Sequence, residues 1–149
     1  MRRPSAGRGP SRAERGSAAV ELVLVVPALV LVLGLLIAGG RLWFARATVV
    51  EASESAARAA SLARTAGDAR DAGQRAGHRV LDTDGLRCAA LSVAVDVGAF
   101  GVPVGTPATV RSTVTCRVPL ADLTLPGMPG SITVRSDGGA ALDTYRARS

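Results

Sequence analysis

The longest apolar stretch of the chain lies near its N-terminus. From Leu22 to Gly40, 19 residues carry no charge, and most of them are Leu, Val or Ile. At about 1.5 Å per residue this run forms a helix of roughly 28 Å, close to the hydrocarbon thickness of a bilayer. The pattern therefore predicts one transmembrane helix over residues 17–40. Pro27 lies inside it, where neighbouring groups in a membrane can compensate the lost hydrogen bond.

The end of this apolar stretch leaves two alternatives open. Residues 38–40 are small and could be cut by a signal peptidase, which would make the stretch an ordinary secretory signal. Its length exceeds the usual apolar core of about 7–15 residues, which favours a membrane anchor. Trp43 and Phe44 follow at once and suit either the membrane–water interface or packing against a folded domain.

A helical pattern continues over residues 41–80. One apolar stripe runs through it at alternating spacings of four and three, which is heptad spacing. This stripe could pack on helices of other subunits or on the chain's own sheet. The glycines at 67, 73 and 77 predict a break between Gly67 and Gly77, because Gly costs about 1 kcal/mol relative to Ala inside a helix. The stripe consists of Ala45, Val49, Ala52, Ala56, Ala59, Ala63 and Ala66.

Beyond residue 81 the pattern changes to two-residue alternation. Apolar and polar residues alternate over 91–97 and 110–118, which predicts two half-buried strands joined by the Gly- and Pro-containing loop 98–107. A turn is expected at 126–130, followed by short strands at Ser131–Arg135 and Ala140–Tyr145. The predicted fold class is α+β: a long N-terminal helix, transmembrane in its first half, and then a small antiparallel sheet domain over residues 81–149.

Two cysteines, Cys88 and Cys116, lie in the predicted sheet region. An even number of cysteines outside the cytoplasm predicts one disulfide, with two free thiols as the alternative. Placing the cysteines opposite each other in a hairpin sets Val93 against Arg111. A shift of one residue aligns Val95 with Val110 but displaces Cys88, and a bulge near Cys88 would reconcile the two registers.

The positive charge is concentrated in the leader. Of the net charge of +6, residues 1–16 carry +4, from five arginines and one glutamate. The leader is also rich in Pro, Gly and Ser, so residues 1–15 are expected to be disordered. No basic patch with interleaved aromatic residues follows, which argues against a nucleic-acid partner. The arginine excess before the apolar run predicts a cytoplasmic N-terminus and an extracytoplasmic C-terminal region.

A short motif stands where the basic leader meets the apolar run. Gly16 is followed by Ser17, and Glu21 would be the fifth residue of a chain cut after Gly16. This arrangement resembles the prepilin signal of type IV pilins and pseudopilins, although many of those carry Phe where Ser17 stands. Residues 14–60 are similar to the TadE-like family of tight-adherence pilus assembly proteins, on the motif, the apolar stretch with Pro27, and Gly40-Arg41 before an Ala-rich helix.

The resemblance implies a function in assembly. A prepilin-type peptidase would cut between Gly16 and Ser17, and the new α-amine of Ser17 would pair with Glu21 of a neighbouring subunit. Burying a carboxylate at the bilayer edge is costly unless a positive charge compensates it, so this pairing is physically reasonable.

Other chemistry finds little support in the sequence. His78 is the only histidine, so a His-based metal site or catalytic triad has no partners. Residues 82–85 resemble the opening of a calcium loop, but no Glu stands at its closing position, and a helix-to-strand turn is favoured. No phosphate-binding loop, nucleophile motif or pair of catalytic carboxylates is found. The sequence therefore predicts a protein that is not an enzyme and has no cofactor or small-molecule substrate.

Together these features predict a single-pass protein of the cytoplasmic membrane that acts as a pilin-like minor pseudopilin. Its expected partners are other pilin-like subunits, a prepilin-type peptidase and membrane lipid. The alternative is a membrane-tethered binding module that displays its sheet domain outside the cytoplasm and never assembles.

Overall fold

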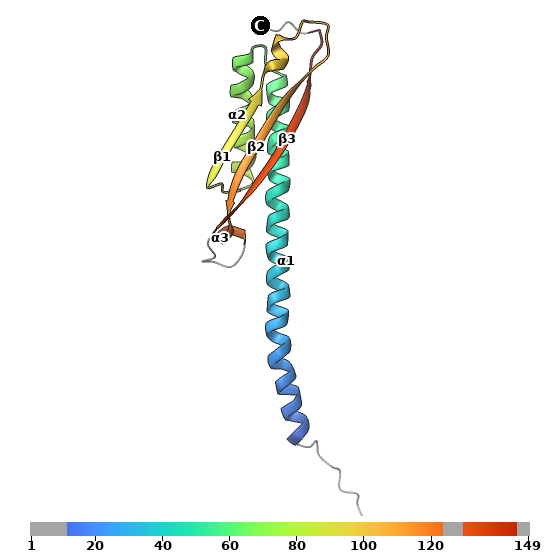
Figure 1. Ribbon diagram of the computed structural model, residues 1–149, viewed down its shortest axis with the longest axis vertical. Helices are drawn as coiled ribbons and strands as arrows, with labels where there is room; N and C mark the ends of the chain where they lie inside the picture. Colours follow the sequence, from blue (N-terminus) through green and yellow to red (C-terminus); the bar gives the residue numbers. More distant parts are fainter. Residues whose placement is uncertain (1–11, 124–129, 146–149) are drawn as a thin grey trace, which may run out of the picture. The chain divides into compact units, whose positions relative to one another are not determined.

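The computed structural model describes residues 12–123 and 130–145 and confirms the predicted α+β class (Figure 1). A long N-terminal apolar helix is followed by a small three-stranded antiparallel sheet. Residues 1–37 and 38–149 form two compact units, and helix α1 contributes to both. The elements are α1 (Arg12–Ser61), α2 (Ala66–Thr83), β1 (Ala90–Asp96), the 3-10 helix η1 (Gly98–Gly101), β2 (Ala108–Pro119), α3 (Leu120–Leu123) and β3 (Ser131–Leu142).

The first unit is the N-terminal part of α1. Every Leu, Val and Ile from Leu22 to Ile37 is exposed, with 47–74% of its surface accessible. A helix that is apolar on all sides and covered by none of its own chain is typical of a membrane span. This part of α1 is therefore a candidate span, consistent with a single-pass membrane protein. The helix already begins at Arg12, inside the leader expected to be disordered, and residues 1–11 lie outside the described part.

The second unit contains the sheet, with β2 in the centre and β1 and β3 at its edges. Val110, Val114, Cys116 and Val118 of β2 are buried, while the alternate positions face outward. Residues expected to form two short strands form the single strand β3, because β2 pairs with it along its whole length, through Gly138 and Gly139. Most of the predicted turn at 126–130 lies outside the described residues.

The pairing of β1 with β2 corrects both predicted registers. Leu91 pairs with Cys116 and Val93 with Val114, a shift of three residues from the cysteine-opposed register and of two from the alternative. The ladder is continuous from Ala90 to Asp96, so the expected bulge is not needed. Cys88 instead precedes β1, and its Cα lies 5.3 Å from that of Cys116, with the two sulfur atoms bonded. The disulfide thus ties the segment before β1 to the central strand.

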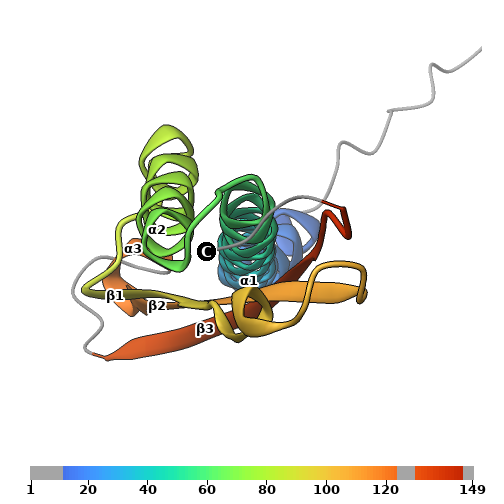
Figure 2. The same cartoon turned by 90° about the horizontal axis from the view of Figure 1, so that it is seen from above.

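Helices α2 and the second half of α1 cover the same face of the sheet (Figure 2). Ala45, Val49, Ala52 and Ala56 of the predicted stripe are buried, but from there the buried face continues through Ala57 and Ala60 rather than through Ala59 and Ala63. The physical reason is that an α-helix has 3.6 residues per turn, so a strict heptad stripe drifts around it by about 20° per heptad. The remaining buried residues of this face are Thr48 and Ser53.

The predicted helix break between Gly67 and Gly77 is wrong. The chain leaves α1 after Ser61 and restarts at Ala66, where the Thr65 side chain accepts a hydrogen bond from the Asp68 backbone N–H at 3.0 Å. Gly73 and Gly77 are buried inside α2 and lie against β1. A Cβ on Gly73 would stand 2.7 Å from Val95 Cγ2, and one on Gly77 would stand 3.0 Å from Val93 Cγ1. These glycines therefore bring helix and sheet together.

The contact between α1 and the sheet is closest at Ser53. A Cβ built on Gly138 would overlap the backbone carbonyl of Ser53. The Ser112 hydroxyl donates to that same carbonyl, and the Ser53 hydroxyl donates to the carbonyl of Val50 at 2.8 Å. The missing side chain on β3 and the hydroxyl group that β2 supplies thus fix where α1 crosses the sheet.

We expect Gly138→Ala to destabilise the fold by about 1–3 kcal/mol, because the added methyl group overpacks against helix backbone that cannot move aside. Gly139→Ala is the matched control, since its Cβ would meet only Thr109 Cγ2 at 3.7 Å, an ordinary contact. Thermal unfolding of the full-length chain in detergent, followed by circular dichroism, measures both. Equal melting temperatures for the two variants would contradict the proposed close approach.

We expect the Cys88–Cys116 disulfide to stabilise the sheet unit by about 3–4 kcal/mol. It closes a loop in the unfolded chain between two cysteines that are 28 residues apart in the sequence, which lowers the entropy of that state. Peptide mapping of protein from native membranes, without reductant, should recover the two cysteines in one linked peptide pair. A reductant should lower the melting temperature of the wild type and leave that of Cys116→Ala unchanged. Two alkylatable thiols in the native protein would contradict this prediction.

Candidate functional site

The predicted processing motif lies on the first turns of α1. Gly16 and Ser17 are consecutive helical residues, and Glu21 follows Ser17 after four positions. Residues at this spacing lie on one face of a helix, about 5–6 Å apart at their Cβ atoms. The backbone therefore presents positions 17 and 21 toward the same side, while their side chains lie outside the described part of the structure. Cleavage after Gly16 and pairing of Glu21 remain predictions.

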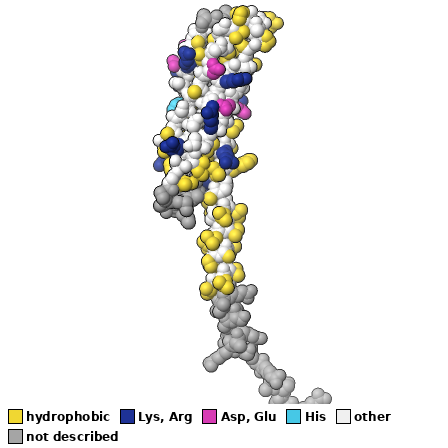
Figure 3. Space-filling model, in the orientation of Figure 1, with side chains coloured by type: hydrophobic (Ala, Val, Ile, Leu, Met, Phe, Trp, Pro, Cys, Tyr) yellow, Lys and Arg dark blue, Asp and Glu magenta, His cyan; other side chains and the backbone are white. Residues whose placement is uncertain are grey.

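Directly after this motif, α1 offers a continuous apolar surface (Figure 3). The Leu, Val and Ile side chains from Leu22 to Ile37 are all exposed and carry no polar group, so they suit contact with lipid. Gly34 has open space around it, with no atom within 4 Å of an added Cβ. Small residues let helix backbones approach each other closely in membranes. This stretch can therefore contact lipid or the corresponding helix of another subunit.

The structure decides what the Ala-rich part of α1 packs against. In the unit formed by residues 38–149, Ala45, Ala52 and Ala56 are buried in the core shared with β1, β2 and β3. The chain's own sheet thus occupies the face that could have packed on other helices. A separate strip of α1 stays exposed, with a salt bridge of 3.4 Å between Glu54 and Arg58. That strip comprises Trp43, Ala47, Val50, Glu54 and Arg58.

The structure shows where the residues weighed as metal or calcium sites lie. His78 is exposed on α2, and no group of three metal-binding side chains occurs among the described residues. The Thr48 hydroxyl donates to Asp84 Oδ2 at 3.0 Å, which links the end of α2 to α1. Gly85 follows with φ +68°, a conformation that Gly adopts without strain. Residues 82–85 therefore comprise the end of α2 and the turn that follows it, as the sequence favoured.

One grouping could not be foreseen from the sequence. Arg41 and Phe44 of α1 line a shallow hollow together with Leu86, Arg87 and Val118. These residues come from α1, the turn after α2, and the end of β2. No spacing rule connects Arg41 with Arg87, because only the packing of α1 and α2 on one sheet brings them together.

Comparison with known families gives a match over part of the chain. Residues 16–58, from the proposed cleavage position into the sheet-covered part of α1, match the family model described as TadE-like protein. This confirms the resemblance found from the sequence. Comparisons with curated proteins and with solved structures returned no match. The chain thus carries a TadE-like region at residues 16–58, and this region indicates a pilin-like protein associated with a tight-adherence pilus.

Proposed function

We propose that this protein is a minor pseudopilin of a tight-adherence pilus or secretion system, which acts by packing its N-terminal helix against other pilin-like subunits. A prepilin-type peptidase removes residues 1–16, and the protein stays in the cytoplasmic membrane through residues 17–40. Its C-terminal unit lies outside the cytoplasm. The protein works as a structural subunit and not as an enzyme.

The observation that carries this proposal is the place of the motif in the structure. Gly16, Ser17 and Glu21 stand at the start of the family match and on the same helix as the exposed apolar stretch. A cut after Gly16 would leave a mature chain that begins at the edge of this stretch. Its N-terminal amine would then lie one helical turn from Glu21. Both groups needed for a charge pair between subunits are thus supplied by every copy of the chain.

The packing of the second unit supports the same mechanism. Because the sheet occupies the Ala-rich face of α1, that face is closed to partner helices. The apolar stretch before residue 38 has no such cover. Contacts between subunits are therefore expected to concentrate within the membrane and along the exposed strip of α1. The alternative, a tether that never assembles, needs neither processing nor Glu21.

We expect Glu21→Gln to preserve insertion and processing but to lower crosslinking between subunits about tenfold. Glutamine keeps the size of the side chain but cannot pair as a charge with the α-amine of Ser17. The loss of a charge-assisted hydrogen bond, net about 1.5–3 kcal/mol, corresponds to tenfold or more in association. The measurement is site-specific crosslinking in cells within the apolar stretch, together with N-terminal sequencing of the mature protein.

Glu51→Gln provides the matched control, because Glu51 is exposed on the same helix. It should leave crosslinking at the wild-type level. If Glu21→Gln and Glu51→Gln behaved alike, Glu21 would have no special part in assembly. If the mature protein began at Met1, or at Arg2 after removal of the initiator methionine, a membrane tether that never assembles would become the better description.

The topology has its own test. We expect protease added to spheroplasts to digest residues 41–149, because arginines before the apolar run favour a cytoplasmic N-terminus. A C-terminal epitope tag, read by immunoblot, reports the fate of this part, and it is unaffected by removal of the leader. A cytoplasmic protein serves as the control for intact spheroplasts. Full protection of the C-terminal tag would contradict the predicted orientation.

A further inference from the structure

The sheet carries a polar hollow at the end where β2 begins and β3 finishes. Helices α1 and α2 lie together on one face of the sheet, and neither covers the opposite face, to which Thr109 and Arg111 point (Figure 2). The hollow has a volume of about 450 Å³, within the range of small-ligand sites. Its polar lining residues are Asp96, Thr109, Arg111 and Thr144. We name it the Arg111 hollow.

The strand register explains why there is space beside Arg111. Strand β1 ends at Asp96, which pairs with Arg111, so Thr109 has no neighbour on β1. On the other side, β2 pairs Arg111 with Gly139 and Thr109 with Ala141. Both of these β3 residues are exposed and small. The guanidinium group of Arg111 is therefore bordered by small residues on one side and by the end of a strand on the other.

Backbone hydrogen bonds hold the walls of the hollow in place. The Gly105 N–H donates to the carbonyl of Thr144 at 2.8 Å, which ties the segment after β3 to the loop before β2. The Gly98 N–H donates to Asp96 Oδ1 at 2.9 Å, which fixes the carboxylate at the end of β1. The polar groups are thus positioned by the fold before any ligand arrives.

The polar groups of the hollow are available to a ligand. Asp96 and Arg111 are cross-strand neighbours, but no ion pair joins them within residues 12–123 and 130–145. Over the same residues, no hydrogen bond occupies the guanidinium group of Arg111 or the hydroxyl groups of Thr109 and Thr144. A ligand can therefore bind one cation, one anion and two hydroxyl groups at the same place.

An aromatic ring stands beside these groups. Tyr145 lines a neighbouring hollow, and the two hollows share Ala141, Leu142 and Thr144. The Tyr145 backbone N–H donates to Asp143 Oδ1 at 3.0 Å, whereas 88% of the residue's surface is exposed. An aromatic ring with a fixed backbone offers a large apolar surface at a small entropic cost.

This set of groups selects the chemistry of the ligand. A guanidinium group binds a carboxylate through paired hydrogen bonds. Asp96 accepts hydrogen bonds from hydroxyl groups but repels a ligand that carries only negative charge. The threonine hydroxyls can donate or accept, and the Tyr145 ring can pack along a sugar ring. A uronic acid, with a carboxylate and several hydroxyl groups on one ring, meets all of these conditions.

We propose that the Arg111 hollow binds uronic acid residues of an acidic polysaccharide. The carboxylate lies on Arg111, and the sugar hydroxyls lie on Asp96, Thr109 and Thr144. This inference goes beyond the proposed assembly function. It relies only on the proposed position of the C-terminal unit outside the cytoplasm, where such polysaccharides are accessible.

The test is isothermal titration calorimetry of the full-length protein in an uncharged detergent. The probe is a short oligomer of galacturonic acid. Its methyl ester keeps the hydroxyl groups but has no charged carboxylate, and oligoglutamate of the same length has carboxylates but no sugar ring. We expect the galacturonic acid oligomer to bind about tenfold more tightly than either of them, since each lacks one of the two kinds of contact.

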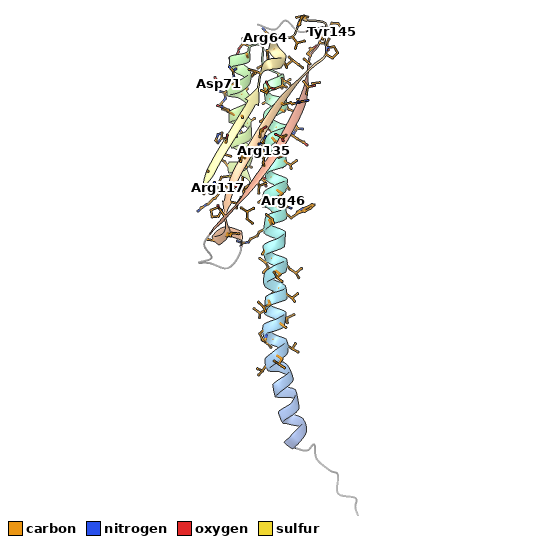
Figure 4. All side chains as sticks on the ribbon, viewed as in Figure 1. Arg46, Arg64, Asp71, Arg117, Arg135 and Tyr145 are labelled. Carbon is orange, nitrogen blue, oxygen red and sulfur yellow. A yellow bond between two sulfur atoms is a disulfide. The ribbon has the colours of Figure 1, made fainter. Side chains whose placement is uncertain are left out.

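We expect Arg111→Gln to weaken binding of the galacturonic acid oligomer about tenfold, because it removes a charge-assisted pair. Arg117→Gln is the matched control, since Arg117 is exposed on the same strand and the same face. Figure 4 shows it at the other end of the unit from Tyr145. Both variants lose one charge, so any attraction of the oligomer to the basic leader falls equally in the two.

A second pair of variants tests the hollow without changing charge. Ala141 lines the hollow, and Ala141→Phe should fill it and abolish binding. Ala90 is exposed on the same face of the sheet but outside the hollow, so Ala90→Phe should bind as the wild type does. Melting temperatures followed by circular dichroism show whether each variant is folded.

Three results would overturn the proposal. The first is equal binding of the galacturonic acid oligomer and its methyl ester. The second is equal or tighter binding of oligoglutamate, which would make the hollow a site for an acidic protein segment. The third is the same affinity in Arg111→Gln and Arg117→Gln, or wild-type affinity in a folded Ala141→Phe. None of these measurements involves leader cleavage, Glu21 or a partner subunit, so a failure here is distinguishable from a failure of assembly.

Discussion

The fold of the C-terminal unit depends on how closely two helices approach one face of a three-stranded sheet. Gly73 and Gly77 let α2 approach β1, and Gly138 leaves room for the Ser53 carbonyl of α1. Small residues remove the spacing that side chains would otherwise impose, and the buried alanines of α1 act in the same way. The cost is a small apolar core, since alanine and glycine bury little area. The Cys88–Cys116 disulfide and the buried serine hydrogen bonds compensate part of that deficit.

Helix α1 is one continuous element whose two parts suit different surroundings. Its first part is apolar on all sides, as lipid requires, and its second part is apolar only on the face that meets the sheet. The TadE-like match extends from the first part into the second and ends at residue 58. The matched region contains the motif, the span and the face on which the sheet is built. The proposed function would use these three features together, because they all lie on one helix.

The sequence by itself determined the apolar span, the alternating strands and the motif at Gly16–Glu21, because each depends on residues close together in the chain. Composition and periodicity are local properties, and a free-standing apolar helix has no tertiary contacts to override them. The strand register, the end of α1 and the role of the α2 glycines were decided only by the tertiary structure. From the sequence alone, Gly73 and Gly77 predict a helix break, and only the position of β1 against them shows that they serve packing. The heptad stripe is buried only as far as Ala56, because helical drift then turns it away from the sheet. Arg41 and Arg87 likewise line one hollow only because α1 and α2 pack on the same face of the sheet. No local rule relates two residues that packing alone brings together.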